Sequence, residues 1–304
     1  MPTFAANGMH QMRKTLLLTA AALILAACNC SGTRINITPE NSQEDQTGPE
    51  TPETPDTPDT PDQETYRLGT YNVGNFNKTE TNSTQMVSTM MKEIGVQALS
   101  MNELDYFNGR HNVDQIKAFA ALMGGWNSFF APAIDYRGGK YGIGVASAPE
   151  LKVVRTEALT LPKGDGSEQR ALAVVEFEPF VFASTHLDHK SADAQLAQAK
   201  TIEEWVENHY GTTDKPVFLC GDFNALPESA TIGFMRGNWT ILSPLEPTYS
   251  AVKPSKCIDY IMVYKNAAAK VRKLDGRVCK EFYGGDVTVA SDHLPVYVEV
   301  EITR

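Results

Sequence analysis

The sequence predicts a four-layer α/β sandwich, in which two mixed β-sheets pack face to face and helices cover their outer sides. Three observations indicate this class. Segments with strand and helix periodicity alternate twice along the chain, and each half ends in a stretch rich in strands. Once a leader and a linker are set aside, about 240 residues remain, enough for one large hydrophobic core without a second domain.

The leader, residues 1–27, has the pattern of an export signal peptide. Arg13 and Lys14 precede an apolar stretch that is too short for a comfortable membrane span, with translation starting at either Met1 or Met12. The final Leu-Ala-Ala-Cys resembles a bacterial lipobox, in which the signal is removed and the cysteine carries lipid. We therefore expect an exported protein anchored through Cys28 to a bacterial cell envelope membrane, facing the periplasm or the exterior. A plain secretory signal is the alternative.

A linker of residues 28–65 follows, with the repeat TPETPDTPDTPD at 51–62. Prolines at every third position favour extended polyproline conformations, and the acidic side chains repel one another. We expect a solvated tether that holds the globular domain, residues 66–304, clear of a surface.

The globular domain is mildly acidic. The whole chain has a formal net charge of −10, but residues 28–62 hold eight acidic side chains against Arg34 alone, and residues 1–27 hold two basic ones. The remainder therefore carries −5. This is not the basic surface of a tight nucleic acid binder, so we expect no sequence-specific nucleic acid partner. We expect a monomer.

The five cysteines do not form a zinc motif, because no C-x-x-C pair and no suitably spaced histidine is present. Cys220 falls in an apolar strand and is expected to be a buried thiol. Cys257 and Cys279 lie at the outer ends of two expected strands, 257–264 and 272–279. If these strands pair around a turn, the two thiols lie opposite each other, which predicts a disulfide in an exported domain.

In the first half of the domain, two strands end in polar residues. The strand 66–73 ends at Asn72, and the apolar strand 96–101 ends at Asn102 and Glu103. Apolar positions at helical spacing predict helices over 84–94 and 112–123. The segment 131–147 is expected to contain a glycine-rich turn followed by a strand at 143–146, and its glycines do not match a dinucleotide fingerprint.

The second half repeats this pattern. Strands are expected at 151–160, 171–177 and 180–185, the last ending at His186, and 192–210 has the clearest helical spacing in the chain. The apolar strand 217–220 stops abruptly at Asp222 and Asn224, and a helix is expected near 228–235. The closing elements are the strands 257–264, which carries Asp259, 271–279, and 294–302, which follows Asp292 and His293.

Polar residues thus gather at strand ends, where loops face solvent and catalytic groups cluster in layered α/β folds. An Asx turn or a structural histidine would explain any one of them. Together they supply carboxylates for a hard divalent ion, a base for water, and donors for a phosphate. The set comprises Asn72, Glu103, His186, Asp222, Asn224, Asp259, Asp292 and His293.

The blocks that carry these residues resemble the endonuclease/exonuclease/phosphatase superfamily, which has the deoxyribonuclease I-like fold. They appear in the superfamily's order across residues 66–304. The matching blocks are TYNVGN (70–75), NELD (102–105), YGIGVAS (141–147), STHLDH (184–189), GDFNALP (221–227), IDYIMV (258–263) and SDHLPV (291–296).

The resemblance implies a role for each residue. Glu103 is the main carboxylate ligand of Mg²⁺ or Mn²⁺, Asn72 lies beside it in the ion's shell, and Asp292 positions the ion or His293. Asp222 orients or deprotonates water, while Asn224 holds the phosphate. His186 donates to a phosphate oxygen. His293, paired with Asp259, is the second catalytic histidine, and the assignment of base and acid between the two histidines differs within the superfamily.

Two departures bear on the substrate. Ile143 replaces an asparagine frequent in the superfamily, and no acid stands where deoxyribonucleases place a partner for the first histidine. We expect an exported, metal-dependent phosphodiesterase or phosphatase that acts on a small or lipid phosphoester. A secreted endonuclease or exonuclease is the alternative, with Arg110, Arg137, Lys140 and Lys190 as scattered basic candidates. A catalytically silent binding lipoprotein is a third reading.

Overall fold

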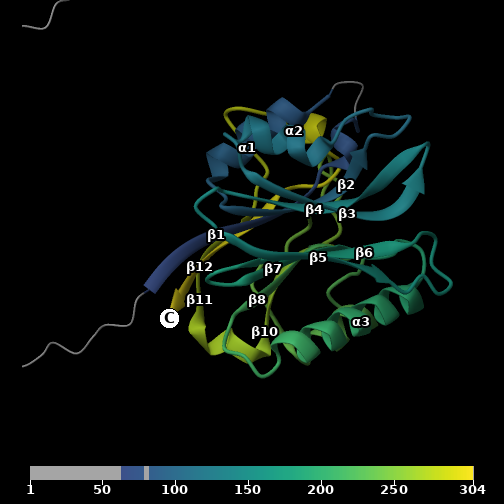
Figure 1. Ribbon diagram of the computed structural model, residues 1–304. Coiled ribbons are helices and arrows are strands. Elements are labelled where there is room, and N and C mark those ends of the chain that lie inside the picture. The colour runs from purple at the N-terminus through teal and green to yellow at the C-terminus, as the bar shows by residue number, and fades with distance from the viewer. Residues whose placement is uncertain (1–62, 79–81, 304) are drawn as a thin grey trace, which may run out of the picture. The chain divides into compact units, whose positions relative to one another are not determined.

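The computed structural model describes residues 63–78 and 82–303, and these residues confirm the predicted four-layer sandwich. Two six-stranded sheets pack face to face, with α1 (Thr84–Ile94) and α2 (Gln115–Leu122) outside one and α3 (Ala192–Tyr210) outside the other (Figure 1). The predicted leader, the lipidation site Cys28 and nearly all of the linker lie outside the described residues. In the described part of the chain, no helix is long and apolar enough to cross a membrane.

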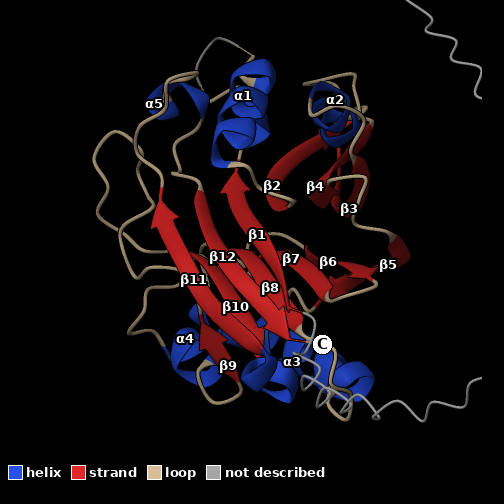
Figure 2. Ribbon diagram, turned by 90° about the vertical axis from the view of Figure 1, so that its left-hand side faces the viewer, coloured by secondary structure: helices blue, strands red, loops and turns tan. Residues whose placement is uncertain are grey.

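The first sheet has the strand order β11-β12-β1-β2-β4-β3 (Figure 2). Only β1 and β2 are parallel, so the sheet is mixed. Its strands are β1 (Gln63–Asn72), β2 (Ala98–Tyr106), β3 (Asn127–Tyr136), β4 (Gly139–Ser147), β11 (Val271–Val278) and β12 (Val296–Thr303). Strand β1 starts before the expected boundary at Tyr66, because Gln63 already pairs with Thr303.

The second sheet has the strand order β5-β6-β7-β8-β10-β9, with β7 and β8 parallel. Its strands are β5 (Val153–Leu161), β6 (Arg170–Phe177), β7 (Val181–His186), β8 (Val217–Asp222), β9 (Trp239–Ile241) and β10 (Asp259–Tyr264). The remaining elements are the 3₁₀ turns η1 (Gly74–Phe76) and η2 (Lys265–Lys270) and the short helices α4 (Ala230–Met235) and α5 (Val287–Ala290).

Strand alternation divides the apolar side chains between two cores. Along β8, Phe218 and Cys220 belong to the core between the sheets, whereas Val217 and Leu219 belong to the core beneath α3. Helix α3 contributes apolar side chains such as Ile202 to that outer core. Both faces of β8 are therefore buried, which explains why its sequence is a continuous apolar run.

The predicted disulfide between Cys257 and Cys279 is wrong. Strand β10 pairs with β8 and β9, whereas β11 pairs with β12 in the other sheet, so the two strands do not form a hairpin. Within the part of the chain that the structure describes, both cysteines are free thiols. The expected buried thiol at Cys220 is confirmed, and burial raises its pKa well above the ordinary value.

Two strands and one short helix were not foreseen. Strand β3 carries Pro132, which an edge strand tolerates because one side of its backbone has no partner strand. Strand β9 is only three residues long, too short for a periodicity signal. Residues 287–290, which lead to Asp292, form the helix α5, whose N-cap Asp286 accepts a hydrogen bond from Thr288.

Asp188 anchors the loop between β5 and β6 to the segment after β7. Its Oδ1 accepts hydrogen bonds from the backbone amides of Lys190 (2.8 Å) and Ser191 (2.9 Å), and its Oδ2 accepts from the amide and hydroxyl of Ser167 (2.7 and 2.8 Å). Burial alone would raise the pKa of Asp188, but these donors hold it well below the ordinary value. The carboxylate thus fixes the chain next to His186.

We predict that Asp188→Asn lowers the free energy of unfolding by about 2–3 kcal/mol at neutral pH, because an amide cannot accept this set of donors. Since the folded pKa is depressed, the carboxylate's stabilisation is present above the unfolded pKa of about 3.9 and is lost as pH falls toward the folded value. Urea unfolding between pH 2 and 7 should show a flatter acid limb for the variant. Asp135→Asn, at an exposed side chain, is the control. Equal unfolding curves for the two variants would contradict this assignment.

Candidate active site

A cleft of about 530 Å³ opens where the polar residues predicted from the sequence come together. Six of the eight line it directly: Glu103, His186, Asp222, Asn224, Asp292 and His293. The other two lie immediately behind these, because the Asn72 amide contacts Glu103 and Asp222, and Asp259 contacts His293. The structure therefore gathers the whole predicted set at one site.

Strand register accounts for this gathering. His186 and Asp222 are paired positions on the parallel strands β7 and β8, and Asp222 pairs with Asp259 across the antiparallel strands β8 and β10. In the other sheet, the parallel pairing of β1 with β2 places Asn72 opposite Asn102, next to Glu103. Residues 30 to 37 positions apart in sequence thus become neighbours within each sheet.

An irregularity in β2 directs Glu103 into the cleft. The register of β2 against β4 shifts between Met101 and Leu104, and Glu103 has a φ of 60°. This left-handed conformation costs a non-glycine residue about 1–3 kcal/mol and is retained where the surrounding structure imposes it, often at functional positions. The Nδ2 of Asn72 donates to Glu103 Oε1 and to Asp222 Oδ2, both at 3.1 Å.

Asn102 connects the two sheets beneath the cleft. Its Nδ2 donates to the carbonyl oxygen of Thr185 on β7 (2.8 Å), and its Oδ1 accepts from the backbone amide of Asp222 on β8 (3.0 Å). The side chain is fully buried. The carboxylates of Glu103 and Asp222, one from each sheet, are therefore held in a fixed relation.

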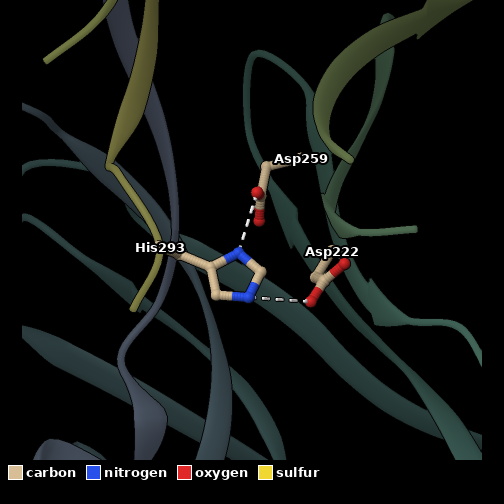
Figure 3. A group of neighbouring side chains, drawn as sticks. All are labelled: Asp222, Asp259 and His293. Atoms are coloured by element: carbon tan, nitrogen blue, oxygen red, sulfur yellow. Dashed lines mark hydrogen bonds and ion pairs between the residues drawn. The ribbon is translucent and has the colours of Figure 1, made fainter. Parts of the chain in front are cut away.

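His293 lies between two carboxylates (Figure 3). Its Nδ1 is 2.9 Å from Asp259 Oδ2, which also accepts from Thr248 Oγ1 at 2.5 Å, and its Nε2 is 3.5 Å from Asp222 Oδ2. Burial opposes the charged ring, but Asp259 and Asp222 overcome this and raise the pKa of His293 to about 10. For Asp222, burial is the largest influence and raises its pKa to about 7. An imidazolium thus faces a carboxyl group that can exchange a proton near neutral pH.

His186 has the opposite character. Its Nε2 is 3.5 Å from the same Asp222 Oδ2, but burial and the nearby Arg170 lower the pKa of His186 well below the ordinary value. In the described residues, Asp222 is its one carboxylate ion-pair partner. This agrees with the sequence, which offers no dedicated acid for the first histidine, and it leaves His186 as a neutral donor.

The donor set fits a hard divalent cation at Glu103 and Asp292. The carboxylates of both residues approach one cationic group, the ammonium of Lys78, and Asp292 Oδ1 is buried without a hydrogen-bond partner among the described residues. Oxygen ligands of this type suit Mg²⁺ or Mn²⁺. A second group, Asp222, Asp259 and His293, brings three potential ligand atoms within 4.8 Å of one another. Because both nitrogens of a protonated His293 are donors, that group is better suited to proton transfer than to ion binding.

Sequence reasoning missed the basic side chains that line the cleft, namely Lys78, Arg170 and Lys256. None of the scattered basic candidates foreseen from the sequence lines it. Arg110 instead pairs with the buried Asp105 and lies over the rings of Tyr136 and Tyr141. The aromatic wall of the cleft is formed by Tyr141, which opens the block YGIGVAS but was given no role, and by Tyr249, which lies in none of the matching blocks.

Comparison with known proteins agrees with this geometry. Residues 69–293 match the model of the endonuclease/exonuclease/phosphatase family. The chain belongs to this family. Among curated proteins, Protein angel of Drosophila melanogaster is 43% identical over 60 residues, a stretch that spans 19% of this chain and 16% of that protein.

Solved structures of the endonuclease/exonuclease/phosphatase family share the fold at low sequence identity. A Bacteroides thetaiotaomicron mannosyl-6-phosphatase aligns with a TM-score of 0.65 at 17% identity, covering 77% of this chain and 99% of its own. ANGEL2, a 2′,3′-cyclic phosphatase, aligns with a TM-score of 0.62 at 13% identity, covering 79% of this chain and 95% of its own. Both of these structural relatives are phosphatases by name.

We predict that Asp259→Asn lowers the pKa of His293 from about 10 toward the ordinary histidine value of about 6.5, because it removes the charge that most strongly favours the imidazolium. An NMR titration of the imidazole C2 proton in chelator-treated protein measures this. Asp193→Asn, at an exposed position in the first turn of α3, should leave the titration unchanged. An unaltered His293 pKa in Asp259→Asn would show that Asp259 does not control the ring.

Proposed function

We propose that this protein is a divalent-metal-dependent phosphoester hydrolase that acts outside the cytoplasm on a small or lipid phosphoester. One observation carries the proposal: the amide of Asn72 joins Glu103 to a single buried carboxylate, Asp222, whose Oδ2 faces two histidines, one neutral and one charged. Such a site offers a water-activating group, a proton donor and neutral hydrogen-bond donors within one cleft.

In this proposal Glu103 and Asp292 hold Mg²⁺ or Mn²⁺, with Asn72 orienting Glu103 through its amide hydrogen bond. A bound divalent ion stabilises negative charge on the phosphoryl oxygens and lowers the pKa of water in its shell. Asp292 Oδ1, which has no hydrogen-bond partner, remains available as a ligand.

The remaining groups act on the phosphate and the water. Asp222, with a pKa raised to about 7, orients the attacking water and accepts its proton. Asn224 Nδ2 already donates to the carbonyl oxygen of Leu187, and its second hydrogen is directed to the phosphoryl oxygen. The neutral His186 donates to another phosphoryl oxygen, and the imidazolium of His293 supplies positive charge and a proton.

Two features support a small or lipid substrate over long DNA. The globular part carries little basic surface, and the cleft of about 530 Å³ matches the size of small-molecule pockets. The named activities of the mannosyl-6-phosphatase and ANGEL2 are consistent with such a substrate. A nuclease remains the second candidate, because Lys78, Arg170 and Lys256 give the cleft local positive charge. A silent binding protein is disfavoured because none of the predicted catalytic groups is missing.

We predict hydrolysis of a small phosphoester that requires Mg²⁺ or Mn²⁺ and stops in chelator. Glu103→Ala should weaken ion binding and activity together. Asn224→Ala should keep the ion and lose about 2.7–4 kcal/mol of transition-state stabilisation, the effect of removing one oxyanion donor. His293→Ala should reduce turnover at saturating ion concentration. The measurement is a panel of phosphomonoesters, phosphodiesters, lipid phosphodiesters and plasmid DNA.

The outcomes separate mechanism from substrate. Full activity in chelator, or in Glu103→Ala and Asp222→Ala, would refute the mechanism. Rapid plasmid cleavage without action on any lipid or small ester would leave the mechanism in place and identify a nuclease. Asp135→Asn, at an exposed side chain, serves as the matched acidic control and should retain wild-type activity.

We also propose that the protein is exported and anchored through lipid on Cys28, with the acidic tether spacing the enzyme from the membrane. Cys28→Ala should abolish lipid labelling and release the processed protein into the soluble fraction. Radiolabelled fatty acid incorporation and membrane fractionation measure this. A membrane-bound Cys28→Ala protein with unchanged processing would rule the anchor out.

A further inference from the structure

The ammonium of Lys78 lies between two carboxylates. Its Nζ is 3.4 Å from Glu103 Oε2 and 3.2 Å from Asp292 Oδ2, and 31% of the side chain is exposed. These are the two acids to which the proposed function assigns the divalent ion. The three residues come from separate segments of the chain, one after β1, one in β2 and one before β12, so the fold itself brings them together.

The backbone leaves room for this lysine. Gly74 has a φ of 52°, and a Cβ atom there would lie 2.2 Å from Lys78 Cγ and 2.4 Å from Lys78 Cε. The aliphatic part of Lys78 therefore runs across the glycine of the η1 turn. The amide of Gly74 donates to Asn72 Oδ1 at 3.0 Å, which ties this turn to the site. The lysine is thus positioned by a turn that any larger residue would obstruct.

The ammonium of Lys78 and a divalent ion would both neutralise the carboxylates of Glu103 and Asp292, and the two cations repel each other at short range. Two like charges about 4 Å apart in a partly buried site oppose each other by several kcal/mol, so both cations cannot share the pair of acids. We propose that Lys78 is an internal counter-cation that competes with the divalent ion for Glu103 and Asp292 and must leave when the ion binds. The inference rests on the proposed function for the location of the ion, but not on hydrolysis.

Competition has a measurable consequence for affinity. If Lys78 occupies the pair of acids about nine-tenths of the time, the apparent Kd for the ion is raised about tenfold over that of the unblocked site. Removing the ammonium should therefore tighten ion binding. A lysine that instead helped to retain the ion, or that did not contact these acids, would give weaker or unchanged binding when removed.

The test is Mn²⁺ binding to the purified chain, followed by electron paramagnetic resonance of free Mn²⁺, without any substrate. Lys78→Met should bind Mn²⁺ about tenfold more tightly than wild type. Lys256→Met is the matched control: it removes a positive charge from the same cleft, but that lysine lies 5.8 Å from the Tyr249 ring centroid and forms no ion pair with the two acids. The control should change the Kd much less.

Thermal melting is the second measurement, and it distinguishes a change in ion binding from misfolding of the variant. In chelator, Lys78→Met should melt below wild type because the two carboxylates lose their counter-charge, and Mn²⁺ should raise its Tm by more than it raises that of wild type. If Lys78→Met fails to fold, Lys78→Gln takes its place. Equal or weaker Mn²⁺ binding by the folded neutral variant overturns the proposal, as does an equal gain in Lys256→Met.

These results are independent of the test for hydrolysis. Tighter Mn²⁺ binding in Lys78→Met together with no phosphoesterase activity would keep this inference and reject the proposed function. Wild-type Mn²⁺ affinity in Glu103→Ala would show that the ion lies elsewhere and would reject this inference, whatever the enzyme hydrolyses.

Discussion

The buried amide of Asn102 is the contact on which the site depends. It donates to Thr185 on β7 and accepts from the backbone of Asp222 on β8, while its own strand belongs to the opposite sheet. Asn72 makes a second connection of the same kind, from β1 to Asp222. A buried amide that loses its partners costs about 1–3 kcal/mol, so sliding of the sheets is opposed by polar contacts as well as by core packing. Glu103, the proposed ion ligand on one sheet, and Asp222, the proposed proton-transfer carboxylate on the other, consequently keep one spacing.

The two histidines show how the surroundings give one residue type two roles. Both rings have Nε2 at 3.5 Å from the same oxygen of Asp222. His293 has Asp259 on its other nitrogen, and this charge outweighs the cost of burial. His186 has Arg170 nearby, which adds to the effect of burial and favours the neutral ring. The site therefore holds one protonated ring and one neutral ring, although both rings lie at the same distance from Asp222.

Strand periodicity predicts the site where a residue follows directly from an apolar run. His186 and Asp222 end two buried strands, so the change from apolar to polar residues marks them in the sequence. Lys78 and Arg170 lack this signal, since one lies in a loop beyond a strand and the other begins a strand. The error over Cys257 and Cys279 has a related cause. Neighbouring strands in sequence suggest a hairpin, but periodicity does not indicate to which of two sheets a strand belongs.

The position of β12 links chemistry to the completion of the chain. This strand inserts between β11 and β1, at the centre of one half of its sheet, and the residues just before it include Asp292 and His293. During synthesis from the N-terminus, β1 and Asn72 emerge first and can pair with β2, but the other edge of β1 has no partner strand until β12 arrives. A nascent chain that lacks this C-terminal segment therefore carries six of the eight clustered residues without Asp292 and His293. The side chains of the candidate site are thus brought together only when the C-terminal strand β12 has been added.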